Sequence, residues 1–89
     1  MYSKEVTIVN PSGLHARPAS DFVARAEEFE CDITIGRLGE DEVDAKSIVM
    51  LLTLGLCRGE KAVLAAEGSD AQAAVEALAE LVASGFGEV

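Results

Sequence analysis

The residue types best suited to chemistry stand together in the stretch GLHARPAS, residues 13–20, which contains the only histidine of the chain. Pro18 favours the first turn of a helix, because the N–H that proline lacks would have no partner there. A helix is therefore predicted to begin near Ala16, with His15 at or just before its N-cap. The free backbone N–H groups of Ala16 and Arg17 then point toward His15, and a helix N-terminus favours an anion.

A neutral imidazole is expected at His15, because the positive end of the helix dipole disfavours imidazolium, and a neutral imidazole is a nucleophile. Arg17 supplies a planar guanidinium that can hold phosphate oxygens bidentately. The Ser12 hydroxyl could orient the second ring nitrogen, and Gly13 permits a close backbone approach. Together they describe a site for a phosphoryl group bonded to the imidazole. A surface histidine beside a solvated arginine explains the same spacing, so both interpretations stay open.

Seven elements are expected to position this stretch. Alternating apolar residues predict strands, and apolar residues at helical spacing predict helices. The expected elements are a strand over 4–9, a helix from Ala16 to near Phe29, a strand over 31–35, a hairpin within 36–44 that leads into a short strand at Val43, a helix after Ser47 closed by Gly55, a strand over 61–66 and a helix that stops at Gly85. Each has one apolar face, so one sheet that contains antiparallel strands, with the helices packed on a single face, is expected.

The expected class is an α/β (α+β) open two-layer sandwich with the order β-α-β-β-α-β-α, and residues 1–89 are expected to form a single domain. Ser47 is the predicted N-cap of the second helix, a contact that contributes about 1 kcal/mol. Ser69, with Gln72 three residues later, has the spacing of a capping box for the last helix. No role is assigned to the ending SGFGEV.

The charge of the chain narrows the classes of function. Seven Lys and Arg residues against sixteen Asp and Glu residues give a net charge of −9, which argues against non-specific binding to nucleic acid or to anionic membranes. No stretch approaches the ~20 apolar residues of a membrane span, and residues 1–6 lack the apolar region of a signal peptide, so a cytoplasmic location is expected. Cys31 and Cys57 lack metal-ligand spacing and are expected to be buried small hydrophobes. No metal or cofactor is expected.

The segment NPSGLHARPAS, residues 10–20, resembles the active-site motif of the HPr family, the histidine-containing phosphocarriers of the sugar phosphotransferase system. A second segment, DAKSIVMLLTLG, residues 44–55, resembles the regulatory serine segment of that family. The resemblance covers the whole chain, and the family's four antiparallel strands and three helices agree with the elements expected above. The turn RLGEDEVD is one residue longer than is usual in the family, which moves the serine to position 47 and implies a longer hairpin loop.

The resemblance implies a phosphoryl carrier, not an enzyme that turns over a substrate. His15 would accept a phosphoryl group on Nδ1 from Enzyme I and pass it to a sugar-specific enzyme IIA, and Arg17 would stabilise the group in transfer. Supporting roles fall to Ser12, Gly13, Ala16 and Pro18. The expected partner-binding residues are Ser20, Lys46, Ile48, Leu51 and Leu52. A monomer is expected.

The resemblance also implies regulation at Ser47 by an HPr kinase/phosphorylase, with the phosphorylated form acting beside a catabolite-control transcription factor. One alternative is a purely regulatory protein of the same fold that works through Ser47, but paralogues of that kind lack the histidine. Another is a small phosphate-binding hydrolase in which Arg17 holds phosphate and the Asn10 amide places a water. That hypothesis does not explain His15 beside the arginine.

Overall fold

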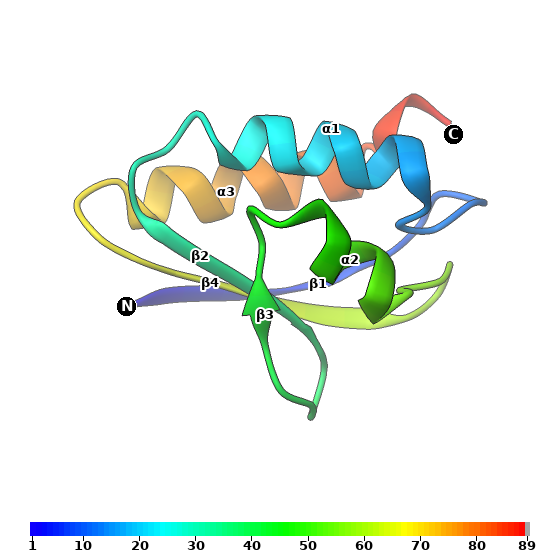
Figure 1. Ribbon diagram of the computed structural model, residues 1–89, viewed down its shortest axis with the longest axis horizontal. Coiled ribbons are helices and arrows are strands. Elements are labelled where there is room, and N and C mark those ends of the chain that lie inside the picture. The colour runs from blue at the N-terminus through cyan, green and yellow to red at the C-terminus, as the bar shows by residue number, and fades with distance from the viewer. Residues whose placement is uncertain (89) are drawn as a thin grey trace.

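The computed structural model describes residues 1–88 and is built on one four-stranded antiparallel sheet with the strand order β1-β4-β2-β3. The strands are β1 (Tyr2–Thr7), β2 (Asp32–Arg37), β3 (Val43–Asp44) and β4 (Lys61–Glu67). The helices are α1 (Ala16–Ala26), α2 (Ile48–Leu54) and α3 (Ala71–Ala83), followed by the 3-10 turn η1 (Gly85–Gly87). Figure 1 shows the three helices on one side of the sheet. The predicted open sandwich and its element order are confirmed.

The core lies between the sheet and the helices, because alternate strand residues point toward the helices. The inward positions predicted from alternation are confirmed: Val6, Ile8, Ile33 and Ile35 are all buried. Phe22 of α1 is the largest of the fully buried side chains. Truncation of a buried Phe to Ala costs about 3–5 kcal/mol, so this one aromatic ring anchors α1 on the sheet.

Local patterns predict the starts of α1 and α2 correctly. Ser47 is the N-cap of α2, and its Oγ accepts a hydrogen bond from the Met50 N–H at 3.3 Å. α1 ends at Ala26 instead of near Phe29. The chain then continues in a tighter turn, because the Phe29 N–H donates to the Ala26 carbonyl, three residues back, at 3.2 Å.

The predicted capping box at Ser69 is wrong. The N-cap of α3 is Asp70, and its side chain makes no capping hydrogen bond. Its carboxylate instead accepts hydrogen bonds from the backbone N–H groups of Glu30 at 2.9 Å and Cys31 at 3.0 Å, and these bonds hold the pKa of Asp70 below its ordinary value. The start of α3 is thereby tied to the start of β2.

The two cysteines differ in their surroundings. Cys31 is buried, as predicted, but the prediction of a buried Cys57 is wrong: its thiol is exposed in the turn after α2, where it donates to the Gly55 carbonyl at 3.4 Å. No helix within residues 1–88 is long and apolar enough to cross a bilayer. The same residues contain no group of three or more His, Cys, Asp or Glu side chains placed to hold a metal ion.

Candidate phosphoryl-transfer site

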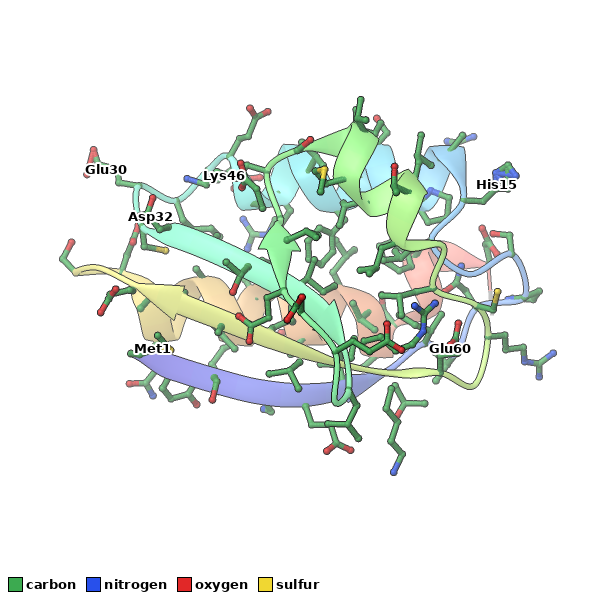
Figure 2. The ribbon with its side chains drawn as sticks, turned by 60° about the horizontal axis from the view of Figure 1, so that its bottom comes forward. Met1, His15, Glu30, Asp32, Lys46 and Glu60 are labelled. Carbon is green, nitrogen blue, oxygen red and sulfur yellow. The ribbon has the colours of Figure 1, made fainter. Side chains whose placement is uncertain are left out.

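His15 is the N-cap of α1, at the position predicted from Pro18. Its backbone is extended (φ −80°, ψ −171°), and its Nδ1 accepts a hydrogen bond from the Ala16 N–H at 2.9 Å. Because Nδ1 is an acceptor, it carries the lone pair and lies at the positive end of the helix dipole. Figure 2 shows the imidazole projecting away from the body of the protein, and the side chain is exposed. The nucleophilic nitrogen and a backbone donor therefore lie together at the surface.

The turn before His15 is built by Asn10 and Gly13. Asn10 is fully buried, and its Nδ2 donates to the Gly13 carbonyl at 2.8 Å, while the Gly13 N–H donates to the Asn10 carbonyl at 3.1 Å. Gly13 has φ +65°, and a Cβ on it would lie 2.4 Å from the Leu56 carbonyl oxygen. Only glycine fits this position, so the close backbone approach predicted at Gly13 is present.

The burial of Asn10 also bears on the hydrolase hypothesis. That hypothesis needs the Asn10 amide to place an attacking water beside Arg17. The Asn10 side chain is fully buried, its amide nitrogen supports the turn through Gly13, and its Oδ1 is shielded from solvent. Asn10 is therefore a structural residue of the turn, and the hydrolase hypothesis lacks its water-placing group.

Among residues 1–88, no hydrogen bond joins the Ser12 hydroxyl to the imidazole, in contrast to the sequence prediction. The hydroxyl donates to the carboxylate of Glu88, whose two oxygens lie 2.9 and 2.7 Å away, and the Ser12 N–H donates to the same carboxylate at 3.2 Å. These hydrogen bonds, with smaller effects from Asn10 and the nearby His15, hold the pKa of Glu88 below its ordinary value. Glu88 is a residue of the site that the sequence analysis missed, because nothing local relates position 88 to position 12.

Arg17 and Ser20 lie on α1 after His15 and are exposed, whereas Pro18 is buried. Within residues 1–88, the Arg17 guanidinium makes no ion pair. An exposed guanidinium two residues after His15 suits an incoming anion. Lys46 is partly engaged, because its Nζ donates to the Phe29 carbonyl at 2.7 Å.

A hollow lies beside His15. It is lined by the turn before His15, by the end of α2 and by the residues that follow α2. Its lining residues are Ser12, Leu14, His15, Leu52, Gly55, Leu56 and Cys57. Next to it, α2 exposes an apolar patch, which we define as Ile48, Val49, Met50 and Leu52; Val49 is 66% exposed. Contiguous exposed apolar side chains mark interaction surfaces. The hollow and the patch make this end of the molecule the candidate docking surface.

The prediction that Leu51 contacts a partner is wrong, because its side chain is fully buried in the core. Val49 and Met50, which the sequence analysis did not select, are exposed instead. α2 has only seven residues, so its apolar run gives no clear period, and only the packing of α2 against α1 decides which side chains are covered. Ile48 and Leu52 are exposed, as a partner contact requires.

The open-faced sandwich with its four antiparallel strands and three helices is the architecture of the small histidine-containing phosphocarriers. A crystal structure of HPr-C-His from Thermoanaerobacter tengcongensis aligns with a TM-score of 0.95 at 40% identity, over 100% of this chain and 99% of that chain. A crystal structure of Crh, the catabolite repression containing protein of Bacillus subtilis, aligns with a TM-score of 0.74 at 38% identity, over 96% of this chain and 97% of that one.

Sequence comparison specifies the family. A family described as "PTS HPr component phosphorylation site" matches residues 2–84. The Phosphocarrier protein HPr of Haloferax volcanii is 44% identical over 82 residues, which cover 91% of this chain and 92% of that protein. The chain belongs to the HPr family, whose members are phosphocarriers of the phosphotransferase system.

Proposed function

We propose that His15 is the residue that carries the phosphoryl group and that the group is bonded to Nδ1. The observation that carries this proposal is the position of Nδ1 at the N-cap of α1, exposed and 2.9 Å from the Ala16 N–H. The Nδ1 lone pair attacks phosphorus, a new P–N bond forms, and the bond from phosphorus to the donor breaks with its electron pair returning to the donor. The Ala16 N–H then becomes available to a phosphoryl oxygen.

Arg17 stabilises the group in transfer. Phosphoryl transfer needs charge stabilisation and positioning more than covalent chemistry, and a guanidinium can bind two oxygens at once. The exposed Arg17 follows His15 by two residues on the same helix end. Gly13, Ala16 and Pro18 support the site by permitting the turn, donating the first N–H and fixing the helix start. Ser12 supports it through Glu88, which holds the turn in place.

Enzyme I and an enzyme IIA are the proposed donor and acceptor. The apolar patch on α2 and the hollow lined by His15 offer these partners a docking surface beside the imidazole. A carrier that gives and receives at one atom must present one surface to both partners in turn. Exposed Ser20 on α1 and Lys46, which precedes Ser47 and the apolar patch in the sequence, are the further proposed contacts, and the charge of Lys46 would mainly affect the association rate.

Ser47 is the proposed regulatory phosphorylation site, with an HPr kinase/phosphorylase and a catabolite-control transcription factor as partners. Its hydroxyl is half-buried at the N-terminus of α2 and directly precedes the apolar patch. A phosphate is tolerated there by the helix dipole, yet it adds a dianion at the edge of the docking surface of an acidic protein. The likeness to Crh, which is named for catabolite repression, favours this second function.

The test of the proposed function is direct phosphorylation. The purified protein is incubated with Enzyme I and phosphoenolpyruvate, and mass spectrometry is used to detect one added phosphoryl group. An acid-labile, base-stable adduct is expected, present in Ser47→Ala and absent in His15→Ala. No adduct on the wild-type chain, or an adduct that persists in His15→Ala, contradicts the proposal.

The Ser47 proposal has its own test. Incubation with ATP and an HPr kinase/phosphorylase is expected to give an acid-stable phosphate that is absent in Ser47→Ala and present in His15→Ala. An active kinase that leaves the wild-type chain unmodified refutes the regulatory role without touching the role of His15.

A further inference from the structure

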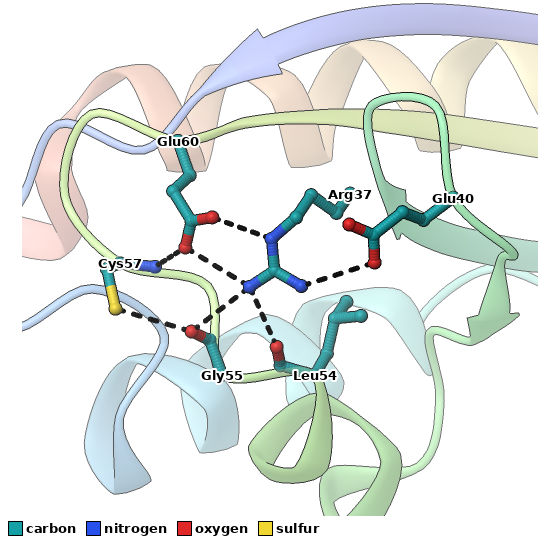
Figure 3. A network of polar contacts seen from close by, with 6 residues as sticks. All are labelled: Arg37, Glu40, Leu54, Gly55, Cys57 and Glu60. Carbon is teal, nitrogen blue, oxygen red and sulfur yellow. Dashed lines mark hydrogen bonds and ion pairs between the residues drawn. The ribbon is translucent and has the colours of Figure 1, made fainter.

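Arg37, at the end of β2, connects the sheet to the loop beside the site without contacting His15. Its Nε donates to Glu60 at 2.6 Å, and its Nη2 donates to Glu60 at 3.2 Å and to the Leu54 and Gly55 carbonyls at 3.0 and 3.4 Å. Its third nitrogen pairs with the more exposed Glu40 at 3.6 Å. Figure 3 shows the guanidinium at the centre of this network. One side chain thus makes contacts on two sides of a single loop.

Glu60 completes the network from the far end of that loop. Its Oε1 accepts a hydrogen bond from the Cys57 N–H at 2.8 Å, in addition to the one from Arg37 Nη2. The Arg37 hydrogen bond, followed by the Cys57 N–H, lowers the pKa of Glu60 to about 2. The carboxylate therefore stays ionised, and the ion pair persists, throughout the physiological pH range.

The carbonyls that Arg37 binds close the C-terminus of α2. The last four carbonyls of a helix lack partners inside the helix, and a cation near them is stabilising. α2 has no basic residue in its own last turn. Arg37 supplies this missing charge from a different element, and it thereby fixes the end of the helix that carries Leu52 into the hollow.

The loop held in this way, residues 54–60, is hydrogen-bonded to the backbone before His15. The Leu56 carbonyl accepts from the Leu14 N–H at 2.9 Å and lies against Gly13, where a Cβ would approach it to 2.4 Å. Both contacts are between backbone atoms, so no side chain can change its rotamer to compensate for a shift of the loop. A displacement of residues 54–60 is therefore transmitted to Leu14 and to the imidazole that follows it.

We propose that Arg37 and Glu60 are positioning residues for phosphoryl transfer at His15. They act through the Leu56 carbonyl, which holds Leu14 and so sets the direction of the imidazole. The inference rests on the proposed function of His15 and adds to it a second layer of residues that never touch the phosphoryl group. A misplacement of the reacting group by about 1 Å can lower the rate about a hundredfold. Partial loss of the hydrogen bonds made by Arg37 and Glu60 is therefore expected to have a measurable effect on the rate.

The first experiment measures kcat and KM of Enzyme I for the protein as phosphoryl acceptor. Arg37→Met keeps an unbranched apolar stem and removes every donor. We expect kcat to fall about tenfold with little change in KM, because Arg37 lies outside the apolar patch. Arg37→Lys keeps the charge but cannot bind Glu60 and the two carbonyls together, so it restores only part of the loss. Arg37→Met/Glu60→Gln loses no more than Arg37→Met alone, because both changes release the same loop.

Lys4→Met is the matched control. Lys4 forms an ion pair with Glu76 at 3.2 Å that joins β1 to α3, and neither residue contacts the loop 54–60. Like Arg37→Met, Lys4→Met removes an ion pair made by a basic strand residue, and it is expected to leave kcat unchanged. Amide hydrogen exchange supplies a second readout at the site itself: the Leu14 N–H is expected to exchange faster in Arg37→Met and at the wild-type rate in Lys4→Met.

The outcomes separate the two levels of the proposal. If the wild-type chain takes up no phosphoryl group, the proposed function itself fails. If the wild type is phosphorylated on His15 and Arg37→Met matches it in kcat and in Leu14 exchange, only the positioning role is overturned. Where Arg37→Met does not fold, Glu60→Gln decides: a kcat reduced about threefold supports the role, and an unchanged kcat refutes it.

Discussion

The substitution Gly13→Ala tests how closely the His15 turn and the loop after α2 are packed. Gly13 has φ +65°, and an added Cβ would lie 2.4 Å from the Leu56 carbonyl oxygen and 3.0 Å from the Cys57 Cα. All three nearest atoms belong to backbone, so no flexible side chain can move aside. The two loops must separate, and the hydrogen bond from the Leu14 N–H to the Leu56 carbonyl, 2.9 Å long, is the first contact to break.

The magnitude follows from two separable effects. A left-handed conformation costs an alanine about 1–2 kcal/mol. Loss of one hydrogen bond adds about 0.5–1.5 kcal/mol. Gly13→Ala is therefore expected to lower the free energy of unfolding by about 1.5–3.5 kcal/mol, with relaxation of the loops deciding where in that range it falls.

Gly39→Ala is the matched control, because Gly39 has φ +85° and no atom within 4 Å of the added Cβ. It is expected to show the conformational cost alone, about 1–2 kcal/mol, and to leave phosphorylation by Enzyme I unchanged. Urea unfolding followed by circular dichroism measures both variants. Equal losses of stability, together with wild-type phosphorylation of Gly13→Ala, would refute the claim that the contact between the two loops holds His15 in place.

Three further predictions concern burial and charge. Leu51→Ala is expected to lower the free energy of unfolding in urea by about 2–5 kcal/mol, because Leu51 is fully buried. Leu52 is 44% exposed, so Leu52→Ala is expected to lower it far less and to raise the KM of Enzyme I instead. Equal losses of stability in the two variants would contradict this prediction. Glu60 has its pKa lowered from 4.5 to about 2, so its stabilising effect is complete above pH 4.5 and disappears as the pH falls toward 2. The difference in unfolding free energy between wild type and Glu60→Gln is expected to shrink over that interval, and a constant difference would contradict it. A thiol reagent is expected to label Cys57 at once and Cys31 only on unfolding, as peptide mapping can check; early labelling of Cys31 would be the contrary result.

The sequence predicts those parts of the fold that depend on neighbours along the chain. Pro18 fixes the helix start and places His15 at the N-cap, and Ser47 caps α2 by the same local rule. The alternation of Ile33 and Ile35 identifies the inward face of β2. In each case, the residues that interact lie within about one helical turn or one strand of each other, so the physical cause is visible in the sequence itself.

The errors fall where partners come from distant parts of the chain. Asp70, not Ser69, begins α3, because its carboxylate is drawn to the backbone at the start of β2. The Ser12 hydroxyl donates to Glu88, which lies beyond α3 in the sequence and is brought to it by the tertiary arrangement. The ion pair between Arg37 and Glu60 involves two residues that belong to no sequence motif. They lie close together because β2 pairs with β4. Such contacts depend on the tertiary arrangement and leave no periodic signal.

The measurement closest to the central claim is nitrogen-15 NMR of the imidazole after phosphorylation by Enzyme I and phosphoenolpyruvate. The structure presents Nδ1 of His15 as the lone-pair nitrogen beside the Ala16 N–H. The account predicts phosphorus coupled to Nδ1, with Nε2 unmodified and with no phosphorus on any other residue. Phosphorus coupled to Nε2, or located on another residue while His15 stays unmodified, would contradict it.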